Sequence, residues 1–138
     1  MNKELDELLC GRYPLIFADR NKPKTHTNMC FGLTCGDGWF DLIDTLCERL
    51  QFWTDKTGAS QVIAFQVKEK YGELRFYVKG EITGEQQGMI DMAQRLSERL
   101  CDQCGCPGQR MTCGPLVITR CSKHMPSDAT PLQNIDLS

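Results

Sequence analysis

Two pairs of metal-ligating side chains near the C-terminus constrain this chain more than any other feature. Cys101 and Cys104 form the first pair and Cys121 and His124 the second, which gives the spacing C-x2-C-x16-C-x2-H. Each pair places two ligands on one tight turn, and four such ligands complete the closed tetrahedral shell of a structural zinc ion. Gly105 suits a tight turn after the second cysteine, because glycine tolerates a left-handed backbone. The spacing therefore predicts one structural Zn²⁺ bound by these four side chains.

Two further cysteines in the same segment compete for a place in the ligand set. Cys106 lies only two residues after Cys104, which is too close for an ordinary partner in the same turn. Cys113 could replace Cys121 as the third ligand, but Cys121 brings His124 with it after a two-residue gap. Because residues 100–124 contain few apolar side chains, we expect the metal to supply much of the folding energy of this segment.

Length and composition indicate one domain with a small metal-bound lobe. The chain has 138 residues, of which 41% are hydrophobic, and its net charge is −2. That charge argues against a chain held on nucleic acid by bulk electrostatics. The sequence shows neither an apolar run long enough for a membrane span nor an apolar N-terminal signal segment. We therefore expect a cytoplasmic protein, in which nine cysteines indicate metal binding rather than disulfides.

Helical periodicity marks three segments, at residues 2–10, 38–56 and 85–100. Asp37, which stands between two glycines, is the expected N-cap of the second helix, and Gly11 is the expected C-cap of the first. The apolar stripes comprise Leu5, Leu8 and Leu9 in the first helix, Trp39, Leu42, Ile43, Leu46, Leu50 and Trp53 in the second, and Met89, Met92, Ala93, Leu96 and Leu100 in the third.

Alternating apolar residues predict a β-hairpin over residues 62–79, with Gly72 as the positive-φ residue of its turn. The expected inward side chains are Ile63, Phe65, Val67, Leu74, Phe76 and Val78, and the outward ones are Gln66, Lys68, Arg75, Tyr77 and Lys79. Together these elements predict an α+β fold, in which two main helices pack on an antiparallel hairpin or small sheet. A zinc-ribbon or treble-clef-like lobe closes the C-terminus.

These elements divide the chain into three parts. We expect an α+β core at residues 1–100, a zinc-binding lobe at 101–124 that continues from the last helix, and a flexible tail at 125–138. The tail is polar and contains two prolines. Residues 18–30 are also polar and without periodicity, which predicts a loop within the core.

Residues that would support catalysis are sparse. One of the two histidines, His124, belongs to the metal set, and the other, His26, lies in the polar loop. No phosphate-binding, dinucleotide-binding or nucleophile-elbow motif is present. The pair Cys101 and Cys104 also has the spacing of a redox dithiol, but such a site should precede a helix, and here the pair follows one. We therefore expect a protein that is not an enzyme.

The hairpin is the first candidate binding surface. Residues 59–80 carry a net charge of +2, whereas the segments before and after them are each at −2. The basic and aromatic side chains that could contact phosphates or stack on bases are Lys68, Lys70, Tyr71, Arg75 and Tyr77. The ordinary alternative is a solvated strand face with alternating charges.

Asp37 and Trp39, in the glycine-flanked turn before the second helix, form a second candidate surface. The ordinary alternative is that Trp39 anchors the core rather than forming an exposed hot spot.

Three blocks of this sequence together resemble a group of small proteins of bacteriophages and prophages. They are Gly36-Asp37-Gly38-Trp39, the segment QVKEKYGELRFY at 66–77, and Ser97-Glu98-Arg99 leading into the two ligand pairs. The resemblance covers about residues 8–124. It implies an accessory protein in a bacterial cytoplasm that acts by binding a host or defence protein, and it assigns no catalytic residue. The alternative is a nucleic-acid-binding regulator that uses the basic hairpin face and the zinc lobe.

Overall fold

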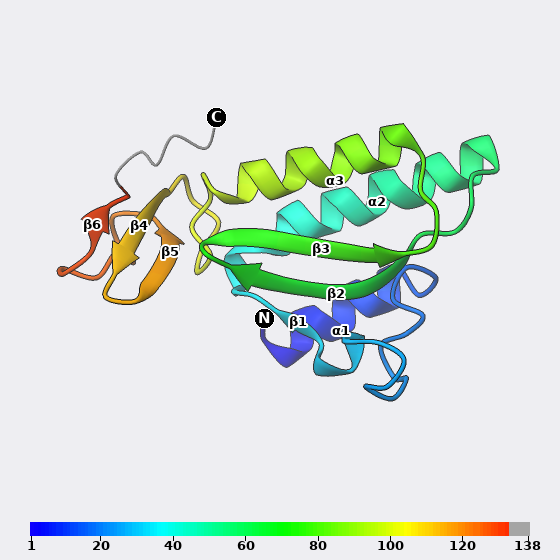
Figure 1. Cartoon of the computed structure of the whole chain (residues 1–138), viewed down its shortest axis with the longest axis horizontal. Coiled ribbons are helices and arrows are strands. Elements are labelled where there is room, and N and C mark those ends of the chain that lie inside the picture. The colour runs from blue at the N-terminus through cyan, green and yellow to red at the C-terminus, as the bar shows by residue number, and fades with distance from the viewer. Residues whose placement is uncertain (133–138) are drawn as a thin grey trace.

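The structure of the chain is a computed structural model that describes residues 1–132. Within this range it contains three α-helices and two three-stranded sheets, which confirms the expected α+β class. The helices are α1 (Lys3–Arg12), α2 (Phe40–Thr57) and α3 (Gly84–Ser97), and the strands are β1 (Leu33–Thr34), β2 (Ile63–Lys70), β3 (Glu73–Lys79), β4 (Gln109–Cys113), β5 (Leu116–Arg120) and β6 (Thr130–Pro131). Figure 1 shows α2 and α3 running along the larger sheet, with the smaller sheet forming a separate lobe at one end.

The larger sheet has the strand order β1-β2-β3. The predicted antiparallel hairpin is confirmed as β2 and β3, and the short strand β1 adds a parallel neighbour to β2. Tyr71 and Gly72 form the two-residue loop of the hairpin, and both have positive φ, at 54° and 76°. This combination is that of a type I′ turn, which matches the twist of the strands. The expected left-handed Gly72 is confirmed, but the left-handed Tyr71 was not expected.

A β-bulge at Phe65 reverses the alternation of β2. The pairing with β3 is regular except after Ala64, where Phe65 is an extra residue. Val62 and Ala64 are buried before the bulge and Val67 is buried after it. The expected inward positions Ile63 and Phe65 are therefore wrong, and Val67 is correct. The inward residues of β3 are confirmed, because Leu74 and Phe76 are buried and Val78 packs against the core.

The first helix differs from its prediction at its end and on its buried face. α1 continues through Gly11 to Arg12, so Gly11 is not its C-cap. Leu9 is buried but Leu8 is 43% exposed, and the other buried residue is Asp6. The Asp6 carboxylate accepts a hydrogen bond from the Leu33 backbone N–H at 2.8 Å and pairs with Arg20 at 3.1 Å. This polar anchor explains why a charged side chain occupies the inward face.

The second helix starts later than predicted, because residues Asp37–Trp39 form a 3₁₀ turn, η2, before α2 begins. Asp37 is not the N-cap of α2; its carboxylate instead accepts hydrogen bonds from the backbone and side chain of Asn2, at 2.6 and 3.0 Å. The inward stripe is largely confirmed, since Trp39, Ile43, Leu46 and Leu50 are buried.

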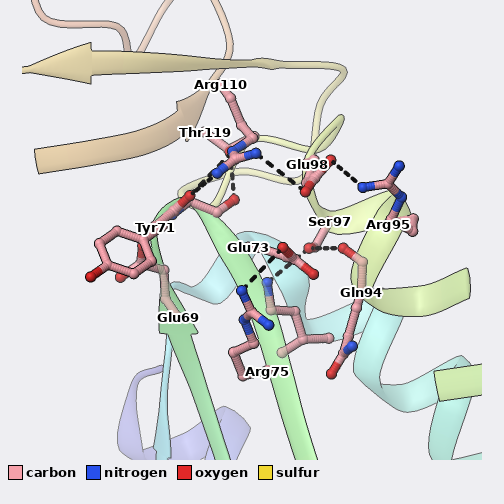
Figure 2. Close-up of polar contacts among 12 residues, drawn as sticks. Glu69, Tyr71, Glu73, Arg75, Gln94, Arg95, Ser97, Glu98, Arg110 and Thr119 are labelled. Carbon is pink, nitrogen blue, oxygen red and sulfur yellow. Dashed lines mark hydrogen bonds and ion pairs between the residues drawn. The ribbon is translucent and has the colours of Figure 1, made fainter. Parts of the chain in front are cut away.

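The third helix starts at a capping box between Thr83 and Gln86 and ends at Ser97 rather than at residue 100. Its last turn also protects the outer edge of β3. The Ser97 hydroxyl accepts a hydrogen bond from the Leu74 N–H at 2.8 Å, and the Gln94 side chain accepts one from the Phe76 N–H at 3.0 Å. Figure 2 shows the Ser97 side chain between the end of α3 and the strand. The edge of β3 is thereby covered rather than left open to another strand.

The C-terminal lobe is built on the second sheet, with the order β5-β4-β6. Its strand β6 lies in the segment that was expected to be a flexible tail, and it pairs with β4 at Met111 and Thr112. The lobe therefore extends beyond residue 124, at least to Pro131. The rest of the predicted tail, residues 133–138, lies outside the described part of the chain.

Candidate metal centre

The four predicted metal ligands come together on two short turns of the lobe. The ligand atoms of Cys101, Cys104, Cys121 and His124 all lie within 4.8 Å of one another. Cys101 and Cys121 are buried, whereas Cys104 and His124 are on the surface. These four side chains could therefore hold a metal ion at the edge of the lobe.

The distances between the ligand atoms test whether a tetrahedral ion fits. With Zn–S bonds of about 2.3 Å and a Zn–N bond of about 2.0 Å, two sulfurs should lie about 3.8 Å apart and a sulfur and a nitrogen about 3.5 Å apart. The Sγ atoms of Cys104 and Cys121 are 3.7 Å apart. His124 Nδ1 lies 3.6 Å from Cys101 Sγ and 3.2 Å from Cys121 Sγ. These three of the six distances among the four ligand atoms are thus close to those of a tetrahedral shell.

Hydrogen-bond donors favour the thiolate form of two of the cysteines, and this is the form that binds metals. Burial alone would raise the pKa of Cys101, but backbone N–H groups of Cys121, Gln103 and Cys104 outweigh it and lower that pKa. The pKa of Cys121 is also lowered: its desolvation is outweighed by hydrogen bonds from the Cys104 side chain and the His124 backbone.

The remaining thiol behaves in the opposite way. A backbone hydrogen bond from Cys106 favours the Cys104 thiolate, but desolvation and the neighbouring thiols outweigh it and raise the pKa of Cys104 to about 12. Three adjacent thiolates repel one another, so all three can ionise near neutral pH only when a cation lies between them. This charge pattern fits a divalent metal ion.

The first ligand turn is closed by its own backbone. The Gly105 N–H donates to the Cys101 carbonyl at 2.8 Å, and the Cys101 N–H donates to the Cys106 carbonyl at 2.7 Å. Gly105 has φ 78°, as expected for a glycine that follows the second cysteine of such a turn. Asp102 then joins the two ligand turns, because its carboxylate accepts a hydrogen bond from Arg120 Nε at 2.9 Å.

The glycine-flanked turn at residues 36–39 packs directly against the first ligand turn, residues 101–105. The Gly38 N–H donates to the Asp102 carbonyl at 2.9 Å. A Cβ atom at Gly38 would lie 2.6 Å from Gly105 N and 2.7 Å from Cys104 N, and a Cβ at Gly36 would collide with the Asp102 carbonyl. Only glycine permits this close approach of two backbones. The sequence marked the glycines, but their contact with the ligand turn could be found only in three dimensions.

Trp39 makes a further contact next to the first ligand turn, from inside the core. Its side chain is fully buried, and its indole Nε1–H donates to the Leu100 carbonyl at 3.0 Å, one residue before the first ligand. Trp39 is therefore a core anchor, and its inclusion in a partner surface is wrong. Asp37 remains exposed but is engaged by Asn2.

A second contact between core and lobe is made by the hairpin turn. The Thr119 hydroxyl donates to the Gly72 carbonyl at 2.6 Å, and Arg110 donates to the Tyr71 carbonyl at 3.1 and 2.7 Å. Arg110 also pairs with Glu98 at 3.3 Å, just after α3. Figure 2 shows Arg110 lying between the turn and the end of that helix. The lobe thus contacts three parts of the core: the turn at residues 36–39, the β2–β3 turn and the end of α3.

The other predicted site residues lie apart from the metal centre. Cys106 and Cys113 are not members of the cluster, and Cys113 Sγ instead lies 3.6 Å from an Asp128 carboxylate oxygen. The hairpin residues Lys68, Lys70, Tyr71, Arg75 and Tyr77 are brought together on β2, β3 and their turn, and Tyr71 and Tyr77 are exposed. The structure therefore separates a metal centre from a basic and aromatic strand surface.

Comparison with protein-family models, with curated proteins and with solved structures finds no match for this chain. The resemblance to phage and prophage proteins thus stays a prediction. Within residues 1–132, every helix is too short or too polar to cross a bilayer.

Proposed function

We propose that this chain is a zinc-stabilised interaction protein, in which one structural Zn²⁺ holds the C-terminal lobe together and the core binds a host or defence protein of a bacterial cell. The observation that carries this proposal is the geometry of the four ligands. The chain brings together four side chains, as many as a tetrahedral shell needs, so a zinc ion bound by all four would have no open position for a substrate or a water molecule.

The composition of the lobe supports a structural role for the metal. Among residues 101–131 the buried side chains are those of Cys101, Asp102, Thr119 and Cys121. Because none of them is a large aliphatic or aromatic residue, the ligands themselves occupy the place of a hydrophobic core. Small metal-bound lobes of this kind fold with their ion rather than before it.

Native mass spectrometry tests the metal proposal. We expect one zinc ion per chain, lost on chelation and lost in Cys101→Ser. Cys106→Ser and Cys113→Ser are the matched controls, because both remove a cysteine of the same lobe that lies outside the ligand cluster. Zinc binding that depends on either control cysteine, or no zinc in the purified protein, would contradict the assignment.

An apolar groove between α2 and α3 supports binding of a protein partner. The groove has a volume of about 170 Å³ and is lined by side chains of both helices, among them Leu42, Leu46, Met89, Met92 and Leu96. Met92 is 64% exposed and Leu96 42%, although both belong to the stripe that was expected to face the core. Exposed methionine and leucine side chains in a groove suit an apolar anchor from another protein.

A photo-crosslinking amino acid at position 92 tests this part of the proposal in bacterial lysate. We expect it to crosslink a specific protein, and we expect Leu96→Glu to abolish the crosslink by placing a charge in the groove. Asp91→Asn is the control that should leave the crosslink unchanged, because Asp91 is exposed on α3 and does not line the groove. Absence of any specific adduct, or an adduct insensitive to Leu96→Glu, would reject the groove as the partner site.

A further inference from the structure

We infer that the outer face of the β2–β3 hairpin, made by Lys68, Lys70, Tyr71, Arg75 and Tyr77, binds single-stranded nucleic acid. This surface is distinct from the α2–α3 groove, and the inference does not depend on a protein partner. It rests on an unbalanced cluster of cations, on two exposed rings paired with lysines, and on a strained tyrosine at the turn.

The charge on this face is not balanced internally. Lys68 and Arg75 stand directly opposite each other across the two strands. Opposed like charges destabilise a strand pair, and within residues 1–132 neither Lys68 nor Lys70 makes an ion pair. The acidic groups of the hairpin are already engaged, because Glu73 pairs with Arg75 at 3.5 Å and Glu69 accepts a hydrogen bond from the Gly72 N–H at 2.7 Å. The face therefore presents cations that an external anion would neutralise.

Each of the two lysines lies beside an exposed tyrosine ring. Lys68 Nζ is 6.0 Å from the centre of the Tyr77 ring, and Lys70 Nζ is 5.7 Å from that of Tyr71. The rings are 39% and 61% exposed. In Figure 1 the three α-helices lie beside or behind β2 and β3. Surfaces that bind single strands typically combine aromatic rings, which stack on the bases, with nearby cations, which contact the phosphates.

Tyr71 is the residue that points most directly to a ligand. Its φ of 54° lies in the left-handed region, where a bulky side chain is rare. At the first position of a type I′ turn the favoured residues are asparagine, aspartate and glycine. Strained residues persist where surrounding contacts hold them, and they cluster at functional sites. The hydrogen bonds from Arg110 to the Tyr71 carbonyl hold this backbone in place. They do not involve the tyrosine side chain, which is exposed.

Single-stranded nucleic acid fits this face better than an acidic protein or a DNA duplex. An acidic protein would use the cations but would give the two exposed rings no flat partner. In a duplex the bases are already stacked on one another, so they cannot stack on Tyr71 and Tyr77. A single strand offers both a phosphate chain and free base faces.

Fluorescence anisotropy with a labelled deoxythymidine oligomer of about twelve nucleotides tests the inference in the full chain. We expect binding that weakens as salt rises. Tyr71→Asn should weaken it about tenfold while leaving the salt dependence unchanged, because it removes stacking but no charge. Lys68→Glu should weaken it by at least as much and should also reduce the salt dependence, because it removes a phosphate contact.

Both substitutions should raise the thermal stability of the protein. Weaker binding by a more stable variant cannot be caused by unfolding, so it must reflect a lost contact with the oligomer. Asparagine suits the turn, and glutamate at position 68 would form a cross-strand ion pair with Arg75. Lys56→Glu on α2 is the control, since it makes the same charge change away from the hairpin. The inference is overturned if the oligomer does not bind at low salt, if both variants bind like wild type, or if Lys56→Glu weakens binding equally. Equal affinity for duplex DNA or for polyglutamate would overturn it as well.

Discussion

Gly38 is the residue at which the metal centre and the core come closest. In Gly38→Ala the new methyl group would lie against Cys101 O, Cys104 N and Gly105 N, all of which are backbone atoms that cannot rotate away. We expect this substitution to lower the free energy of unfolding by at least about 2 kcal/mol and to weaken zinc binding, because overpacking against the backbone forces the ligand turn to move. Thermal unfolding and a zinc competition assay measure the two effects.

Gly88→Ala is the control for that substitution. Gly88 lies within α3, and a Cβ atom there would meet nothing within 4 Å. We expect this variant to be more stable than wild type by about 0.5–1 kcal/mol, because alanine favours the helix. If both alanine variants behaved alike, the close approach at Gly38 would not matter for the fold.

Asp19 is a buried carboxylate whose charge is held by two lysines. It is 1% exposed, and it pairs with Lys22 at 2.9 Å and with Lys79 at the end of β3. Burial alone would raise the pKa of Asp19, but the bonds and charges of the two lysines outweigh it and lower that pKa below its ordinary value. We expect Asp19→Asn to reduce the free energy of unfolding at pH 7 by about 2 kcal/mol, because two lysines would lose their counter-charge.

The pH dependence of this effect has a definite sign. A carboxylate with a lowered folded pKa contributes stability above its unfolded pKa of about 3.9, and this contribution is lost as the pH falls through the folded pKa. The difference between wild type and Asp19→Asn should therefore shrink on acidification below about pH 4. Urea unfolding at pH 7 and pH 3 measures it, with the exposed Glu81→Gln as control. A difference that stays constant or grows at low pH would show that the ion pairs are not its source.

The ligand residues could be predicted because their chemistry is encoded by local spacing. Two ligands on one turn are brought together by the chain itself, so only the meeting of the two turns required the fold. The roles of Asp37 and Trp39 depend on distant partners, Asn2 and the Leu100 carbonyl, which no local pattern contains. Local chemistry was therefore readable from the sequence, whereas contacts across the chain were not.

Among the elements, α3 stabilises the sheet through two side chains as well as through its apolar face. Ser97 is fully buried, and its hydroxyl both accepts from the Leu74 N–H and donates to the Gln94 carbonyl. Ser97→Ala leaves the strand N–H without a partner, and we expect a loss of about 1–3 kcal/mol in the free energy of unfolding. Amide exchange should locate the effect at Leu74. Ser60→Ala, in an exposed loop, is the control, and equal losses in the two variants would rule out a specific role for the Ser97 hydroxyl.

The positions of the helices and strands were predicted well, but the side chains that face the core were predicted less well. All three helices and both hairpin strands lie where the periodicity placed them, with ends that differ by a few residues. The bulge at Phe65 could not be predicted from the alternating pattern. One extra residue moves all the following side chains to the other face of the strand, and nothing in the pattern marks where that residue is inserted. The outward turn of Met92 and Leu96 was missed for a related reason. A helix that packs against one neighbour and the sheet still leaves part of a broad apolar stripe uncovered.

At the scale of the whole molecule, core and lobe are two parts with different sources of stability. The core packs one large hydrophobic cluster drawn from the helices and the larger sheet. Among the described residues of the lobe, 101–131, there is no such cluster. The lobe contacts the core at Gly36 and Gly38, at the hairpin turn and at the end of α3. These contacts are mostly hydrogen bonds from side chains, such as Thr119 and Arg110, to backbone carbonyls, with a backbone bond at Gly38. They therefore hold the lobe only while its turns and strands keep their shape.

Removal of the metal should therefore unfold one part and leave the other. On chelation we expect amides of residues 101–131 to lose their protection from hydrogen exchange, while those of β2, β3 and α2 keep theirs, because the hydrophobic cluster does not involve the ion. Amides at the contact, such as the Gly38 N–H that donates to Asp102, should lose protection together with the lobe. Hydrogen-exchange mass spectrometry with and without chelator measures this, and Cys101→Ser should reproduce the chelated pattern without any chelator. A lobe that stays protected after chelation would show that its strands fold without metal, and loss of protection throughout the core would show that the two parts fold as one unit.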